Sequence, residues 1–186
     1  MAATKHAQLI KQDSQTYLTT ALLKLLENKN FNEITISQVV KIAGVSRMAF
    51  YRNFETLDDL LKAYFEPLIR KRFEEIKNKV SEREKLESIG VFFTDYADIL
   101  KLSSEHGFEY IIKDIFNQNM IDFYENLSLP KDLSSIKRKY WTTFMSSGVY
   151  AIWREWLIGG RKESLEEIHS ILASFQNSTM QSLIRA

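Results

Sequence analysis

The chain has 186 residues, of which 25 are Lys or Arg, 24 are Asp or Glu and none is cysteine. The length allows one large or two small domains with a sizeable core, and the missing cysteine excludes disulfides, thiol catalysis and cysteine-based metal sites. The formal net charge of +1 excludes a globally basic protein of the histone kind.

The clearest pattern lies between Phe31 and Phe54 and predicts two short helices joined by a tight turn. Thr35 is expected to cap the first helix, and Gln38 three residues later completes a capping box. Apolar residues then recur with helical spacing and predict one buried face, at Ile36, Val39, Val40 and Ala43. Gly44 follows at once and can adopt the left-handed conformation that ends a helix.

The second short helix is predicted from Arg47 to about Asn53, with Ser46 as its N-cap. The spacing turns Phe50 and Phe54 inward and leaves a basic and aromatic rim toward solvent. Two such helices form a helix-turn-helix, which places a helix in the DNA major groove. Caps around a glycine turn also occur in ordinary helical hairpins, so the pattern alone leaves that alternative open.

The residue types on this rim suit a DNA duplex. Arginine can donate two hydrogen bonds to guanine, Met and Ala can contact a thymine methyl group, and hydroxyl groups can bond phosphate. The expected DNA-binding residues are Thr35, Ser37, Ser46, Arg47, Met48, Ala49, Tyr51, Arg52 and Asn53. Residues 1–55 also hold seven basic and four acidic side chains, a net charge of +3 that leaves −2 for the remainder.

The rest of the chain reads as helices, because proline occurs only at positions 67 and 130 and glycine is scarce. A helix is predicted over 56–80, with a kink or a shifted start at Pro67, since proline removes a helix hydrogen bond. The next helix is expected to open at a capping box formed by Ser81 and Glu84 and to extend through Leu100.

A further helix is predicted to begin at Ser103 or Ser104 and to fade near residue 127, followed by a loop at 128–130. A long helix is then expected over 133–158 and ends at the glycine pair 159–160. Ser164 and Glu167 form the capping box of the last helix.

Residues from about Leu18 to Leu61 resemble the N-terminal domain of the TetR/AcrR family of transcriptional regulators. The family pattern combines an aliphatic first helix, an Ile-Ala-x-x-Ala-Gly-Val-Ser core and a Phe-Tyr-x-x-Phe run. The matching positions are Phe31, Thr35, Val39, Ala43, Gly44, Val45, Ser46, Phe50, Tyr51 and Phe54. The resemblance implies an all-α fold, with a helix-turn-helix DNA-binding domain over 1–55 and a helical ligand-binding and dimerisation domain over 56–186.

Two positions depart from the family pattern. Asn30 stands where glycine is usual, and Asn also tolerates positive φ, so the turn is expected to survive. Leu57 stands where many members carry a lysine that grips phosphate, and Asp58 and Asp59 follow. These acids repel DNA but suit a helix N-terminus, which Thr56 and Asp59 can cap. The departures keep open an alternative function, a helical protein-interaction module with weak or no DNA binding.

The resemblance also implies a homodimer, in which the last two helices of each copy pair as a four-helix bundle. The expected interface residues are Trp141, Gly148, Ile152, Trp156, Ile168, Leu172 and Phe175. A two-fold dimer matches a palindromic double-stranded DNA operator. The alternative is that the core of the chain itself fills these faces.

Family members usually bind a small-molecule effector between the middle helices. The expected pocket residues are Phe93, Tyr96, Phe108, Phe116, Tyr140 and Phe144, from a wider aromatic set that includes Phe92, Tyr110, Phe123, Tyr124 and Trp153. Aromatic residues at helical spacing are usually core, so that alternative stays open.

No motif supports an enzyme. His6, His106 and His169 form no H-x-x-x-H pair, and the chain has no G-x-S-x-G, P-loop or G-x-G-x-x-G run. No cofactor and no metal site are therefore expected. No apolar stretch nears the ~18 residues that span a membrane, and the first residues do not read as a signal peptide. The chain is predicted to be a cytoplasmic, effector-controlled DNA-binding regulator, a repressor without a membrane partner.

Overall fold

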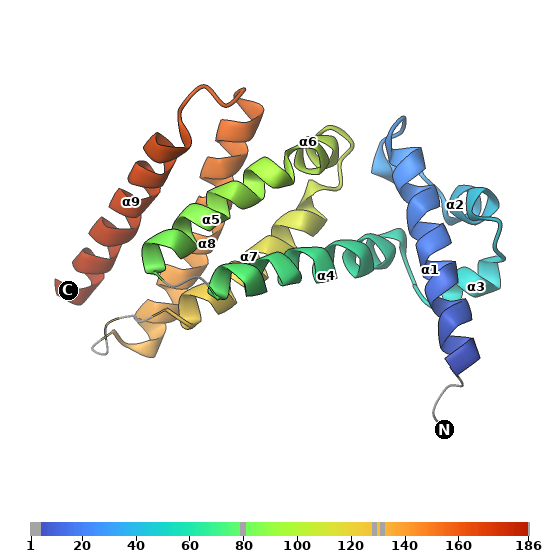
Figure 1. Ribbon diagram of the computed structural model, residues 1–186, viewed down its shortest axis with the longest axis horizontal. Coiled ribbons are helices and arrows are strands. Elements are labelled where there is room, and N and C mark those ends of the chain that lie inside the picture. Colours follow the sequence, from blue (N-terminus) through green and yellow to red (C-terminus); the bar gives the residue numbers. More distant parts are fainter. Residues whose placement is uncertain (1–4, 79–80, 128–129, 131–132, 186) are drawn as a thin grey trace. The chain divides into compact units, whose positions relative to one another are not determined.

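In a computed structural model of the chain, every regular element is a helix (Figure 1). The structure describes residues 5–78, 81–127, 130 and 133–185, and within these residues there is no strand. The predicted all-α class is therefore confirmed. The elements are α1 (Lys5–Leu26), a 3-10 turn (Phe31–Glu33), α2 (Ile36–Ala43), α3 (Arg47–Tyr51), α4 (Leu57–Lys77), α5 (Glu82–Asp95), α6 (Ala97–Glu105), α7 (Glu109–Glu125), α8 (Ser135–Ile158) and α9 (Leu165–Arg185).

The chain divides into two compact units. The first contains the residues up to Pro67 together with Leu102–Ile112, and the second contains Leu68–Lys101 and the residues from Lys113 onward. Helices α4, α6 and α7 therefore each run from one unit into the other. The predicted DNA-binding domain falls entirely within the first unit.

The first unit is organised around α1, against which α2 and α3 pack (Figure 1). Leu18, Leu22 and Leu26 lie on one side of α1 at helical spacing and are wholly buried. Val39 of α2 and Phe50 of α3 are also wholly buried. Each such side chain stabilises the fold by about 1.5–3 kcal/mol relative to an exposed position, so this small core can hold two short helices in place.

The corner between α6 and α7 belongs to the first unit and is tied to it by both backbone and side chains. The Phe31 amide donates to the His106 carbonyl at 2.8 Å, and His106 Nδ1 lies 2.9 Å from the Lys29 carbonyl oxygen. Phe108 is wholly buried, with ring centroids 6.3 Å from Phe31 and 6.2 Å from Phe65. This corner is therefore part of the core that supports the helix-turn-helix.

At the start of α4, the two aspartates near the predicted DNA-binding face form hydrogen bonds within the protein. The Thr56 amide donates to the Asp59 carboxylate at 2.9 Å and the Asp59 amide donates to Thr56 Oγ1 at 3.1 Å, which confirms the predicted capping box. The hydroxyl and amide of Thr56 lower the pKa of Asp59. Asp58 accepts a hydrogen bond from the Tyr110 hydroxyl, and Leu57 is buried. Position 57 thus contributes packing, and both aspartates have structural partners.

Several predicted helix boundaries were wrong. Helix α4 is continuous through Pro67, so no helix starts there. The helix predicted through Leu100 breaks at Tyr96, whose backbone lies outside the helical region at φ −100° and ψ 15°. Ser103 and Ser104 begin no helix but lie in the last turn of α6, which ends at Glu105, and Gly107 at φ +79° reverses the chain before α7.

Other boundaries agree with the sequence pattern. The capping boxes at Ser81 and Ser164 are both present, and α8 ends at Ile158, before the glycine pair. Asn30 is extended at φ −66°, so its turn needs no positive φ, contrary to the expectation. The loop predicted at 128–130 falls largely outside the described residues.

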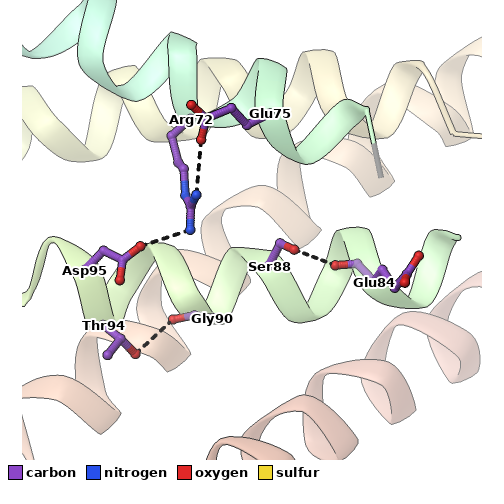
Figure 2. Close-up of polar contacts among 7 residues, drawn as sticks. All are labelled: Arg72, Glu75, Glu84, Ser88, Gly90, Thr94 and Asp95. Carbon is purple, nitrogen blue, oxygen red and sulfur yellow. Dashed lines mark hydrogen bonds and ion pairs between the residues drawn. The ribbon is translucent and has the colours of Figure 1, made fainter. Parts of the chain in front are cut away.

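The second unit has an aromatic core. Phe93 packs against Phe116 at 5.1 Å, Tyr150 at 5.7 Å and Trp153 at 5.9 Å between ring centroids. At the surface of this core, Arg72 of α4 reaches Asp95 of α5 at 2.9 Å (Figure 2). Exposed ion pairs of this kind contribute about 0–1 kcal/mol, so the rings dominate the packing energy.

Candidate nucleic-acid interface

The first helix of the candidate interface is capped as its sequence predicts. The Gln38 amide donates to Thr35 Oγ1 at 3.4 Å, and the Thr35 amide donates to Gln38 Oε1 at 2.9 Å. At the other end, Gly44 has φ +67° and the Val45 amide donates to the Val40 carbonyl at 3.1 Å. A left-handed residue at this point costs little only for glycine, so Gly44 fixes the turn into α3.

The second helix begins where Ser46 Oγ accepts from the Ala49 amide at 3.1 Å. Helix α3 is shorter than predicted, because it ends at Tyr51 and is followed by a turn. Phe50 and Phe54 are buried with ring centroids 5.8 Å apart, which confirms their predicted inward direction. The Phe50 anchor leaves the opposite side of α3 facing solvent.

The exposed side of α3 is joined to α2 by one side-chain contact. Arg47 donates from Nη2 to Ser37 Oγ, so a guanidinium from α3 and a hydroxyl from α2 lie together. Met48 is 66% exposed and Tyr51 is 57% exposed, and Arg52 is exposed as well. The predicted base-reading and phosphate-binding types therefore lie on one accessible face, which we call the α2–α3 face.

Some predicted DNA-binding residues have side chains that are half-buried or already hydrogen-bonded. Asn53 is half-buried and its Nδ2 donates to the Ala49 carbonyl at 2.8 Å, so its amide is used inside the first unit. Ala49 is itself half-buried, and the Thr35 hydroxyl is engaged in its cap. The local hydrogen bond explains the difference for Asn53, since an amide near a helix end often bonds the nearby backbone.

Lys41, a cation beside the α2–α3 face, was not among the DNA-binding residues predicted from the sequence. Lys41 is exposed near the end of α2, opposite the buried positions Val39 and Val40. Lys41 lies outside the apolar stripe of α2. This position could have identified it as a DNA-binding residue, because a lysine outside a buried face can reach a phosphate.

Three of the six predicted pocket residues are placed in the core, and Tyr96 is half-buried. Phe93, Phe108 and Phe116 are wholly buried among other rings, and Tyr140 and Phe144 are instead 66% and 61% exposed. A cavity of about 960 Å³ lies between α5, α8 and α9 of the second unit. It is lined by none of the six predicted residues, although Tyr124 and Trp153 of the wider aromatic set do line it. Phe93 and Phe116 pack against each other at 5.1 Å between ring centroids and so fill their own space, whereas Tyr140 and Phe144 lie at the surface.

The predicted dimer residues divide into two groups. Trp141, Trp156 and Ile168 are buried within the second unit, where Trp141 Nε1 donates to Thr179 Oγ1 at 3.0 Å and Trp156 Nε1 donates to the Glu163 carbonyl at 2.8 Å. These bonds join α8 to α9 and its preceding loop, which explains why the tryptophans are not exposed. In the other group, Gly148, Ile152 and Leu172 are half-buried and Phe175 is exposed.

An exposed apolar face does exist on the last two helices. We call it the α8–α9 face, and its large members are Ile136, Tyr140, Phe144, Ile158, Ile171 and Phe175. The spacing of 136, 140 and 144 places the first three on one stripe of α8, and 171 and 175 share one stripe of α9. The exposed aromatic residues of this face are of the kind enriched at protein interfaces.

The described part of the chain contains no group of three or more His, Asp or Glu side chains placed to hold a metal ion. Nor does any described helix combine the length and the apolar character needed to cross a membrane.

Two family models match the chain. Residues 18–64 match the model described as bacterial regulatory proteins, tetR family, and these residues contain the whole α2–α3 face. Residues 94–178 match the model described as transcriptional regulator C-terminal region, and this range contains all of α7 and α8 and part of α9. The two matches together span most of the chain.

A curated relative, the HTH-type transcriptional regulator EthR of Mycolicibacterium smegmatis, is 29% identical over 90 residues. That match spans 45% of this chain and only 42% of the relative. A TetR transcriptional regulator from Streptococcus agalactiae superposes with a TM-score of 0.67 at 20% identity, over 94% of this chain and 99% of that one. The fatty acid degradation regulator FadR from Bacillus halodurans gives 0.54 at 14% identity, over 86% and 94% of the two chains. The two structural likenesses establish the shared fold.

Proposed function

The chain belongs to the TetR family of transcriptional regulators, and we propose that it is an effector-controlled repressor. In this proposal it binds a palindromic DNA operator as a homodimer. The observation that carries the proposal is the α2–α3 face, where Arg47 contacts Ser37 and Met48 and Tyr51 stand exposed. Residues 1–55 form the proposed DNA-binding domain, and 56–186 form the proposed regulatory and dimerisation domain. The proposed location is the cytoplasm, where the operator would be.

Within the α2–α3 face we assign two kinds of contact. Arg47, Met48 and Ala49 read base edges in the major groove, where guanine accepts from arginine and thymine offers a methyl group. Phosphate contacts come from the polar residues Ser37, Ser46, Tyr51 and Arg52, together with Lys41 on α2. Thr35 and Asn53 are left out because the Thr35 hydroxyl donates to Gln38 and the Asn53 amide donates to Ala49.

Arg47→Ala is expected to reduce discrimination between the operator and unrelated DNA by about 1–3 kcal/mol, because it removes a bidentate base contact. Fluorescence anisotropy with operator and scrambled duplexes measures the two affinities. Lys113→Ala removes a charge of the same sign outside the DNA-binding domain and should leave the affinity ratio unchanged. An unchanged ratio in Arg47→Ala would show that Arg47 reads no base.

Tyr51→Ala is expected to weaken binding to all duplexes alike, by roughly 1 kcal/mol, since a phosphate contact carries no sequence information. The same anisotropy titration on operator and scrambled DNA gives the result. Tyr51→Phe keeps the ring against Phe50 and isolates the hydroxyl, so it should show most of the loss. A loss confined to the operator would assign Tyr51 to base reading instead.

The proposed dimer forms through the α8–α9 face. Tyr140 and Phe144 are moved from the proposed pocket to this interface because they are exposed on α8. Exposed apolar stripes of this kind commonly mark a protein interface, and a two-fold arrangement gives two recognition helices for two half-sites. Trp141, Trp156 and Ile168 support the interface from beneath by joining α8 and α9.

The proposed effector binds in the cavity between α5, α8 and α9, whose volume of about 960 Å³ suits a drug-sized molecule. Such an effector changes DNA binding only if its affinity differs between the DNA-bound and released conformations. We propose that it favours the released conformation, so that the regulator represses in its absence.

An electrophoretic shift with the DNA upstream of the chain's own gene tests the proposal. Salt-sensitive retention of this DNA supports an operator-binding regulator. Complete absence of binding at low ionic strength, with the dimer intact, would favour the helical protein-interaction module. We do not favour that alternative, because the acids that motivated it are engaged at α4 by Thr56 and Tyr110. An enzymatic role has no motif in its support.

A further inference from the structure

Met48 is the most exposed methionine that the structure describes. The chain has five methionines and no cysteine. Met48 on α3 is 66% exposed, whereas Met120 and Met145 are buried and Met180 is half-buried. The Met145 sulfur also accepts a hydrogen bond from Thr179 Oγ1 at 3.8 Å. Among the described methionines, Met48 is therefore the one most open to a small solute.

An oxidant that reaches this protein meets no thiol. Cysteine thiolates are ordinarily the most reactive sulfur groups of a protein toward peroxide, and the methionine thioether is the sulfur group that remains here. Burial protects a side chain from a dissolved oxidant, because the two cannot meet. Both facts direct oxidation of the folded chain to Met48.

The Met48 side chain contributes little to the core of the first unit. Phe50, two residues later on α3, is wholly buried and anchors this short helix, whereas Met48 faces solvent. A single exposed apolar side chain is ordinary in itself. Met48, however, shares the α2–α3 face with Arg47, where its apolar surface suits a thymine methyl group. A chemical change at its sulfur is therefore a change at the surface proposed to read DNA.

Arg52 lies one helical turn from Met48 on the same exposed side. The Arg52 amide donates to the Met48 carbonyl at 3.1 Å, so the two residues have the i, i+4 relation, and both side chains are exposed. Side chains with this spacing are neighbours on a helix surface. The thioether of Met48 is only a weak acceptor, whereas a sulfoxide oxygen would accept strongly from the guanidinium.

We propose that Met48 is a modification site, at which a peroxide converts the chain to a form with weak operator affinity. The Met48 sulfur attacks one oxygen of hydrogen peroxide, so that a sulfur–oxygen bond forms as the oxygen–oxygen bond breaks. Sulfur gives up two electrons, and the departing oxygen takes the proton of the transferred oxygen and leaves as water. The inference rests on the proposed function, because it adds a second control of operator binding at the α2–α3 face.

The sulfoxide weakens DNA binding in two ways. It replaces apolar surface against a thymine methyl group with a polar oxygen, which must give up its water to enter the groove. It also offers an acceptor to Arg52, which then competes with a DNA phosphate for the guanidinium. Loss of the hydration of one polar group corresponds to a fall in operator affinity of about tenfold.

The test treats the full chain with hydrogen peroxide, with and without its operator duplex. Peptide masses locate the added oxygen, and fluorescence anisotropy measures operator affinity after the peroxide is removed. Met48 should gain oxygen before Met180, and operator affinity should fall about tenfold as it does. Bound operator should slow oxidation at Met48 and leave the rate at Met180 unchanged. Methionine sulfoxide reductases should restore the affinity, since this oxidation is reversible.

Three results would overturn the proposal. The first is oxidation of Met180 ahead of Met48, and the second is full oxidation of Met48 with operator affinity unchanged. The third is an equal rate of oxidation at Met48 with and without bound operator, which would place this side chain outside the DNA contact.

Substitutions separate Met48 from other oxidised groups. Met48→Leu keeps the size and apolar character of the side chain, so it should bind operator within about twofold of the original chain and lose the response to peroxide. Met180→Leu, the matched change on α9, should keep the full response. Met48→Gln places a strong acceptor at the same position and should weaken operator binding about tenfold without peroxide. A Met48→Leu chain that still responds to peroxide, or a Met48→Gln chain with undiminished affinity, contradicts the proposal.

The result is separable from a failure of the proposed function. A chain that binds no operator before peroxide is added would refute the proposed function and, with it, the control of DNA binding by Met48. A chain that binds operator equally well before and after oxidation of Met48 would refute the redox control alone and leave the DNA-binding function intact.

Discussion

Phe108→Ala is expected to lower the free energy of unfolding by about 3–5 kcal/mol, the range for loss of a wholly buried phenylalanine. Phe108 has no exposed surface and packs with Phe31 and Phe65 in the core of the first unit. Its removal leaves a cavity directly beneath the segment that leads into α2. Urea denaturation followed by circular dichroism measures the change.

The matched control for this variant is Tyr17→Ala. Tyr17 is an exposed aromatic residue of α1 in the same unit, so its loss should change the free energy of unfolding by no more than about 0.5 kcal/mol. A change below about 1 kcal/mol in Phe108→Ala would contradict the core role of the α6–α7 corner.

The same corner has a consequence for DNA binding. His106 and Phe108 hold the chain segment 29–31 through two hydrogen bonds and a ring contact, and α6 and α7 continue from this corner into the second unit. Phe108→Ala should therefore weaken operator binding even where the protein remains folded, because the support of α2 is loosened. Anisotropy at low temperature separates this effect from unfolding.

The double variant Phe144→Asp, Phe175→Asp is expected to convert the dimer to a monomer. Phe144 and Phe175 are 61% and 51% exposed, so aspartate is solvated in the free chain but becomes an unpaired charge in an apolar interface. We expect the dimer to weaken by at least roughly a hundredfold, or about 3 kcal/mol. Sedimentation velocity at micromolar concentration measures the distribution of species.

Tyr17→Asp is the control for this experiment, since it places the same charge on an exposed aromatic position outside the α8–α9 face. It should remain dimeric. The double variant should also lose high-affinity operator binding, because each monomer contacts one half-site only. A variant that remains fully dimeric would place the interface elsewhere on the chain.

Local signals in the sequence predicted local structure well. The caps at Thr35, Ser46, Ser81 and Ser164 depend on hydrogen bonds that close within three residues, so residue type and spacing are sufficient to find them. The inward direction of Phe50 followed from helical periodicity for the same reason. The caps and the exposed side chains Arg47, Met48, Tyr51 and Arg52 of the α2–α3 face could therefore be predicted, whereas the engagement of Asn53 by Ala49 could not.

Features that depend on distant partners were not predictable in this way. Trp141 and Tyr140 are neighbours of similar character, yet Trp141 is buried with a bond to Thr179 and Tyr140 is exposed. The positions of α7 and α9 decide between them, since the Trp141 ring also packs against Tyr124 at 5.1 Å between centroids. The break at Tyr96 likewise carries no glycine or proline signal, and the cavity is lined by side chains of α5, α7, α8 and α9, which lie far apart in the sequence. Tertiary packing, and not residue type, assigned these roles.

If the α2–α3 face of a dimer reads a specific operator, selection from random duplexes is expected to enrich a palindrome with half-sites about one helical turn apart. Arg47→Ala should relax the preference at a guanine in each half-site. Failure to enrich any sequence, with the dimer intact and no salt-sensitive retention of DNA, would show that this face reads no operator.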